Sequence, residues 1–123
     1  VRDPQALTQN DLRRSMPRFQ APHFAANAGV LERFEQLAKE ANCTPAQLAL
    51  AWLLQRPNVL PIIGTTSIAH LRENLAAVAL RVPADILARA ERLVSDVTVS
   101  GARYAAATLA EIDTDEEQHA RSG

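Results

Sequence analysis

"TPAQLALAWLLQRPNVLPIIGTTSIAHLRENLAA", residues Thr44 to Ala77, is the stretch that decides the fold. It opens with a strong helix start, because Thr44 is a good N-cap, Pro45 suits the first helical position, and Gln47 stands three residues after the cap. We predict a helix over residues 45–55. Its residues are apolar nearly all round, which is typical of a helix enclosed by its neighbours.

A short apolar run, residues 58–63, predicts a strand after this helix. Pro61 cannot donate to a sheet ladder, so it must lie near an end of that strand. Ser67 is then a good N-cap for a second helix. The apolar residues of this helix fall on one face: Ile68, Leu71, Leu75 and Val78.

The junction between the predicted strand and the second helix has the composition of an anion site. The first N–H groups of a helix have no internal partners, and the helix dipole adds partial positive charge there. Gly64 permits close approach to the backbone, three hydroxyl residues follow it, and His70 and Arg72 stand in the first turns. Phosphate sites are built in this way. The same residues also fit an ordinary turn with an N-cap, so both interpretations stay open.

The rest of the chain is predicted to form further helices and irregular segments. Residues 1–26 hold three of the seven prolines and predict a loop, with one helical turn near residues 11–15. A helical stripe begins at Asn27, formed by Val30, Leu31, Phe34, Leu37, Ala38 and Ala41. Another helix starts near Pro83, with Ile86, Leu87, Ala90, Leu93 and Val94 directed inward. One strand cannot form a sheet, so we expect its partners to lie upstream of Val1.

Composition narrows the class of protein. The 123 residues, 47% of them hydrophobic, suit one folded domain, and the net charge of −1 gives no field that attracts nucleic acid or an acidic membrane. No apolar run is long enough to span a bilayer, and no targeting pattern begins the chain, so we expect a cytoplasmic protein. Cys43 is the single cysteine and reads as a small packed residue. The three histidines lack metal-ligand spacing, so no metal site is expected: His23, His70 and His119.

Several motifs, in their order and spacing, resemble the last strand-and-helix unit of the aldo-keto reductases. They are "ALAW" in the first helix, "PIIGT" at the strand, and "LREN" in the second helix. "DLRRSMPRF" and "GARYAAATLAEID" are similar to segments that flank this unit in the family. The resemblance implies an α/β fold, a (β/α)8 TIM barrel of about 250 residues. This chain would be its mostly helical C-terminal part: a loop (1–26), the helices and final strand (27–109) and a tail (110–123).

The resemblance also implies a cofactor site for NADP(H), with NAD(H) as the alternative. Position by position, it assigns the phosphate and ribose to Ile62, Ile63, Gly64, Thr65, Thr66 and Ser67. Glu73 and Asn74 would face the adenine. His70 stands where many members have an arginine that pairs with the 2′-phosphate, which leaves the preference between NADP and NAD open.

The family's catalytic Asp, Tyr, Lys and His come from the first half of the barrel. Here Tyr104 and Lys39 are the only tyrosine and lysine, and neither lies in the catalytic motif. We therefore expect no catalytic residue in this segment, which alone would be inactive. The whole reductase would reduce a small-molecule carbonyl compound to an alcohol by hydride transfer. The alternative is a non-catalytic nucleotide-binding or association module derived from a barrel. In either case the segment needs the rest of the barrel or self-association.

Overall fold

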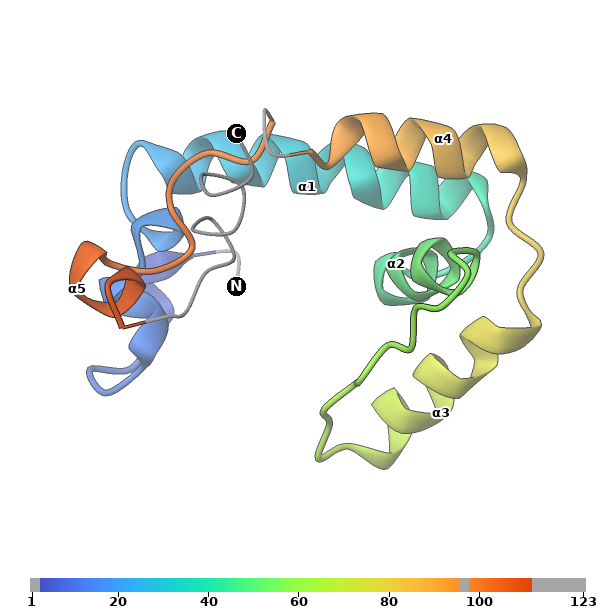
Figure 1. The fold of residues 1–123 in the computed structure, drawn as a ribbon, viewed down its shortest axis with the longest axis horizontal. Helices are drawn as coiled ribbons and strands as arrows, with labels where there is room; N and C mark the ends of the chain where they lie inside the picture. Colours follow the sequence, from blue (N-terminus) through green and yellow to red (C-terminus); the bar gives the residue numbers. More distant parts are fainter. Residues whose placement is uncertain (1–2, 96–97, 112–123) are drawn as a thin grey trace, which may run out of the picture. The chain divides into compact units, whose positions relative to one another are not determined.

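The structure is a computed structural model that describes residues 3–95 and 98–111. These residues divide into two compact units, one joining 3–27 to 100–111 and the other holding 28–95 with 98–99. Figure 1 shows the helices of both units. In chain order they are η1 (Pro4–Ala6), η2 (Leu12–Ser15), η3 (Pro17–Phe19), α1 (His23–Glu40), α2 (Pro45–Leu54), α3 (Ile68–Ala76), η4 (Ala77–Ala79), α4 (Ala84–Leu93) and α5 (Ala106–Leu109).

Helix α1 begins at His23, four residues before the predicted start at Asn27. The backbone N–H of Phe24 donates to the carbonyl of Gln20 at 2.9 Å, which sets the first turn directly after Pro22. The helix ends where Asn42 adopts a positive φ of 52°, a conformation that asparagine tolerates better than most residues. The Cys43 N–H then donates to the carbonyl of Ala38 at 3.0 Å, closing the helix end.

Helix α2 confirms the capping box predicted from the sequence. The Thr44 hydroxyl oxygen accepts the backbone N–H of Gln47 at 3.2 Å, and the Gln47 side-chain oxygen accepts the Thr44 N–H at 3.1 Å. The helix is only partly enclosed within the described residues. Leu48, Leu50 and Ala51 are buried, whereas Leu54 is exposed.

The strand predicted at residues 58–63 does not form in this structure, whose described residues contain no strand. These residues are irregular, and Asn58 has a positive φ of 66°. A strand is stabilised by hydrogen bonds to a neighbouring strand, and the described residues offer none. Ile62 is consequently 96% exposed.

The core of the second unit lies between α1, α2 and α4. Its buried side chains come from all three helices: Leu37, Ala38, Leu48, Ile86, Leu87 and Ala90. Figure 1 shows α1 and α4 side by side with α2 crossing them. Arg89 of α4 donates to the Glu40 carboxylate of α1 at 2.6 Å, at the surface of this pair. Trp52 packs against the core, and the Arg56 guanidinium lies 4.1 Å from its ring centroid.

The first unit contains short helices, two of which, η1 and η2, begin at an aspartate cap. The Asp11 carboxylate accepts the Arg13 backbone N–H at 3.0 Å, which starts η2 and confirms the helical turn predicted near residues 11–15. The pKa of Asp11 falls to about 2, because hydrogen bonds from Arg13 stabilise the ionised carboxyl. The predicted loop therefore contains three short 3-10 helices. The acidic tail predicted from residue 110 lies almost wholly outside the described residues.

Candidate functional site

The junction at residues 64–67 forms a capped turn at the start of α3. The Thr65 hydroxyl oxygen accepts the Ser67 backbone N–H at 3.1 Å. The Ser67 hydroxyl oxygen in turn accepts the His70 backbone N–H at 3.3 Å, which confirms Ser67 as the N-cap. The structure thus brings together Thr65, Ser67 and the backbone of His70.

Two helix N–H groups remain free at this junction. Within the described residues, the backbone N–H groups of Ile68 and Ala69 donate to no acceptor, since the cap takes only that of His70. They carry the partial positive charge of the helix N-terminus. The approach is open, because a Cβ added at Gly64 would meet no atom within 4 Å. The turn therefore presents free donors on an unobstructed surface.

The other predicted cofactor residues lie on both sides of this turn. Ile62 and Ile63 are exposed, as are Thr66 and the side chain of His70. Glu73 and Asn74 are half-buried on α3. The Glu73 carbonyl accepts the side-chain N–H of Gln47 at 3.0 Å, which fastens α3 to the first turn of α2.

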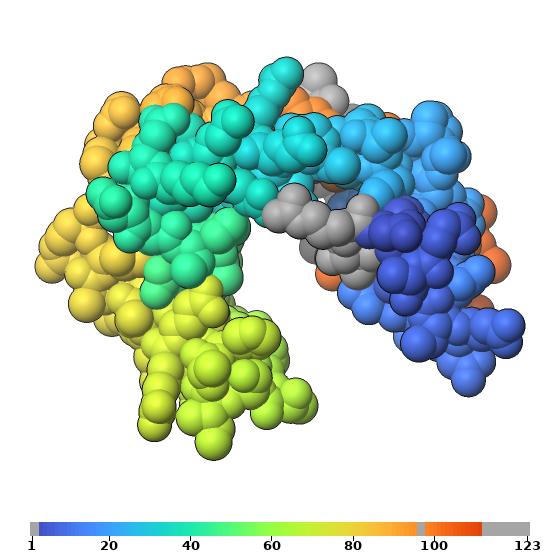
Figure 2. Space-filling view, turned by 180° about the vertical axis from the view of Figure 1, so that it is seen from behind, coloured from blue at the N-terminus to red at the C-terminus, as the bar shows by residue number. Residues whose placement is uncertain are grey.

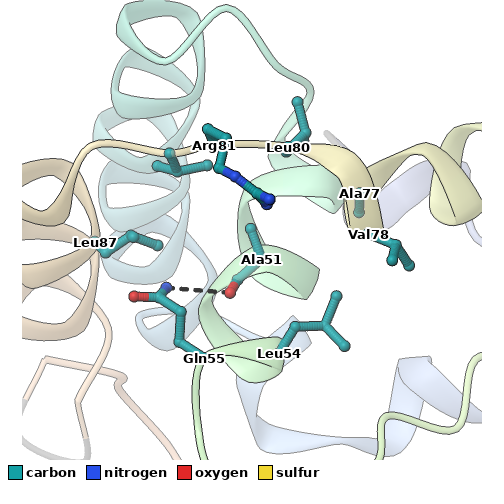
Figure 3. Close-up of a pocket in the computed structure, with 9 residues that line it drawn as sticks. Ala51, Leu54, Gln55, Ala77, Val78, Leu80, Arg81 and Leu87 are labelled. Carbon is teal, nitrogen blue, oxygen red and sulfur yellow. Dashed lines mark hydrogen bonds between the residues drawn. The ribbon is translucent and has the colours of Figure 1, made fainter.

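A separate pocket lies at the other end of α3 (Figure 3). Its volume is about 260 Å³, and it is lined by Ala51, Leu54, Gln55, Ala77, Val78, Leu80, Arg81, Val82 and Leu87. The Gln55 side chain donates to the carbonyl of Ala51 at 3.1 Å, and the guanidinium of Arg81 has no hydrogen bond to a described residue. The C-terminal ends of α2 and of η4 both border the pocket, and their dipoles oppose an anion there. This pocket gives no phosphate site.

Nothing in the sequence pointed to this pocket or to the contacts that join the ends of the first unit. The His23 Nδ1 lies 2.7 Å from the Ser100 hydroxyl oxygen. The Asn27 amide accepts the Ser100 N–H at 2.8 Å and donates to the Ser100 carbonyl at 2.9 Å. These partners are 73 to 77 residues apart, so no local pattern marks them.

The described residues contain neither a candidate metal site nor an activated cysteine. No group of three or more His, Cys, Asp or Glu side chains among them is arranged to hold a metal ion. Cys43 is half-buried beside the core, and burial raises the pKa of its thiol, which lowers the fraction of reactive thiolate. None of the described helices has the length and apolar character needed to cross a membrane.

Comparison with known proteins identifies the family. The model of the aldo/keto reductase family matches residues 2–95, a range that includes the junction and all the predicted cofactor residues. The chain therefore belongs to the aldo/keto reductase family.

Two curated relatives agree with this. "Probable aldo-keto reductase 1" of Glycine max is 43% identical over 96 residues, which make up 77% of this chain and 28% of that protein. "Aldo-keto reductase yakc [NADP(+)]" of Schizosaccharomyces pombe is 35% identical over 104 residues, 84% of this chain and 31% of that protein. The chain thus spans less than a third of the length of either relative.

Proposed function

We propose that this chain is the C-terminal, cofactor-binding part of an NAD(P)H-dependent aldo-keto reductase. The observation that carries the proposal is the open turn at Gly64, where α3 presents free N–H groups within the region that matches the family. Such a helix start suits a phosphate group. A relative whose name includes NADP(+) supports the choice of cofactor, with NAD(H) as the alternative.

The cofactor residues in this proposal are those named from the sequence. The backbone N–H groups of Ile68 and Ala69, with the hydroxyl groups of the turn, would hold a phosphate, while Ile62 and Ile63 lie beside the ribose. Glu73 and Asn74 face the adenine, and His70 lies next to the 2′-phosphate. NAD(P)H supplies the hydride that adds to a carbonyl carbon, and a proton completes the alcohol at the oxygen. The groups that move this proton belong to the rest of the barrel.

The proposed place of the chain in a barrel accounts for its exposed apolar residues. Residues 58–63 would be the last strand of a (β/α)8 barrel, paired on both sides, and α3 would cover it. Leu60 and Ile62 are 85% and 96% exposed in this chain. Packing within a barrel would cover these apolar side chains. The proposal includes a small-molecule carbonyl substrate and a cytoplasmic location.

Substitution at Gly64 tests the cofactor proposal. Gly64→Leu places a bulky side chain on the open turn, where its Cβ meets nothing within 4 Å, so we expect folding to be unaffected. Binding of NADPH should weaken by roughly tenfold or more, about 1.4 kcal/mol, because the side chain blocks approach to the backbone. Titration of the whole reductase with NADPH, followed by cofactor fluorescence, measures this change.

Gly29→Leu is the matched control, since Gly29 on α1 also has no atom within 4 Å of an added Cβ. It should leave the affinity for NADPH unchanged. Equal affinities for wild type and Gly64→Leu would show that the junction is only a capped turn. The alternative function, a non-catalytic association module, would then account for the exposed apolar residues.

A further inference from the structure

Within the first unit, the segment that begins at Ser100 is held against residues 3–27 at one dipeptide, Ser100-Gly101. Its described part, residues 100–111, includes α5. The hydrogen bonds from this segment to residues 3–27 all converge on the dipeptide. We call residues 100–111 the strap, and we call the set of hydrogen bonds at Ser100 and Gly101 the clip.

Ser100 is bonded at each of its polar groups. Its backbone N–H and carbonyl pair with the two ends of the Asn27 amide, as they would pair with a neighbouring strand. Its hydroxyl group lies 2.7 Å from the Nδ1 of His23. Gly101 adds one contact, because its carbonyl accepts the Arg18 Nε–H at 3.0 Å. All three partners are half-buried side chains of the first unit.

The backbone conformation at Gly101 and the close approach of His23 both favour glycine at this position. Its φ is +84°, and a Cβ there would lie 2.8 Å from the Cγ of His23. The His23 ring therefore packs directly on the backbone of the strap. This close approach explains why a glycine stands beside Ser100.

The clip shares no residue with the hydrophobic core. The core side chains come from α1, α2 and α4, between residues 37 and 90, and none belongs to the strap. Beyond the clip, the strap has no side-chain hydrogen bond to residues 3–27 within the described part of the chain. Regions with few buried apolar contacts open at lower free energy than the core.

We propose that the strap is a detachable element: it separates from residues 3–27 as one piece when the clip opens, while the helical core stays folded. Asn27 is the main positioning residue, since it holds both backbone groups of Ser100. The clip contains none of the proposed cofactor residues. The result of the strap experiment is therefore independent of the result of the Gly64 experiment.

Limited digestion of the chain with trypsin tests the proposal, because Arg103 lies in the strap and is exposed. In the wild type, cleavage after Arg103 should be the first cut and should precede any change in the fluorescence of Trp52, which packs against the core. Asn27→Ala should accelerate this cleavage about tenfold and leave the unfolding midpoint read from Trp52 unchanged. Asn10→Ala is the matched control, since Asn10 is exposed in the same unit and makes no side-chain hydrogen bond to a described residue.

A second variant acts on the strap itself. Gly101→Ala should release the strap at least as strongly as Asn27→Ala, because the added methyl group overlaps the His23 ring. Cleavage after Arg103 that keeps pace with the loss of the Trp52 signal would overturn the proposal, since the strap would then open only with the core. An unchanged cleavage rate in Asn27→Ala would overturn it as well.

Discussion

His70 is the residue of the proposed site that would lie next to the 2′-phosphate of NADP(H). Its backbone N–H is held by Ser67, so the start of α3 fixes its place, and its side chain is exposed. An arginine is always charged and can donate two parallel hydrogen bonds to a phosphate, which a single imidazole ring cannot do.

We therefore expect His70→Arg to favour NADPH over NADH. The gain should be about 1–2 kcal/mol, near the lower end for a hydrogen bond to a charged group, or roughly five- to thirtyfold in relative affinity. NADH lacks the 2′-phosphate, so its own affinity should stay constant. Titrations of the whole reductase with both cofactors measure the ratio.

His70→Gln serves as the comparison, because it keeps a hydrogen-bonding side chain without the charge. A ratio of affinities that is the same in wild type and in His70→Arg would place His70 away from the 2′-phosphate. The junction itself would still be tested separately through Gly64.

At the scale of elements, Gln47 links two helices. One end of its amide completes the capping box of α2, and the other end donates to the Glu73 carbonyl of α3 at 3.0 Å. The same side chain therefore caps one helix and positions the next. The proposed cofactor residues Glu73 and Asn74 lie on the helix that this contact fastens.

Gln47→Glu should separate these two roles. A carboxylate can still accept the Thr44 N–H, but it cannot donate to the Glu73 carbonyl, which loses a partner. Leaving an acceptor unpaired costs about 1–3 kcal/mol, so amide hydrogen exchange in α3 should accelerate roughly tenfold. Exchange in the first turn of α2 should change little.

Gln36→Glu on α1 is the control for the added charge, since Gln36 is exposed and has no side-chain hydrogen bond to a described residue. Equal acceleration in α2 and α3 would mean that the carboxylate disturbs the cap as well. No change in either helix would show that α3 is held by apolar packing alone.

The features that the sequence predicted correctly are local ones. Thr44 and Ser67 mark helix starts because each hydroxyl bonds a backbone N–H three residues along the chain. The features that the sequence did not predict correctly depend on residues far away in the chain or outside it. A strand at residues 58–63 needs neighbouring strands that the described residues lack, and Ser100 meets Asn27 across 73 positions. The capped turn that follows Gly64 was predicted correctly, because it is formed by neighbouring residues. Anion binding at this turn is tested by the Gly64 variant.

At the scale of the whole molecule, a large apolar surface is exposed along residues 59–78. The side chains concerned are Val59, Leu60, Ile62, Ile63, Ile68, Leu71, Leu75 and Val78. Figure 2 shows α3 in yellow-green, at the lower left, as part of the molecular surface. A surface of this kind is typical of a protein interface.

We expect the chain, when isolated, to associate with copies of itself through this surface. The variant Ile62→Ser with Leu75→Ser should lower the association, because both side chains are exposed and apolar. Sedimentation over a range of protein concentrations measures the change. Leu12→Ser is the matched control, since Leu12 is 77% exposed but lies in the other unit. A monodisperse wild-type monomer with cooperative unfolding would contradict this prediction.

The contact between His23 and Gly101 has a consequence for how this sequence can evolve. A smaller residue at position 23 would remove the overlap with a Cβ at position 101, yet the φ of +84° would still disfavour any side chain there. Substitution at position 23 alone therefore cannot free position 101. A descendant that changes position 23 loses the contact with the Ser100 hydroxyl group, yet even there position 101 remains glycine.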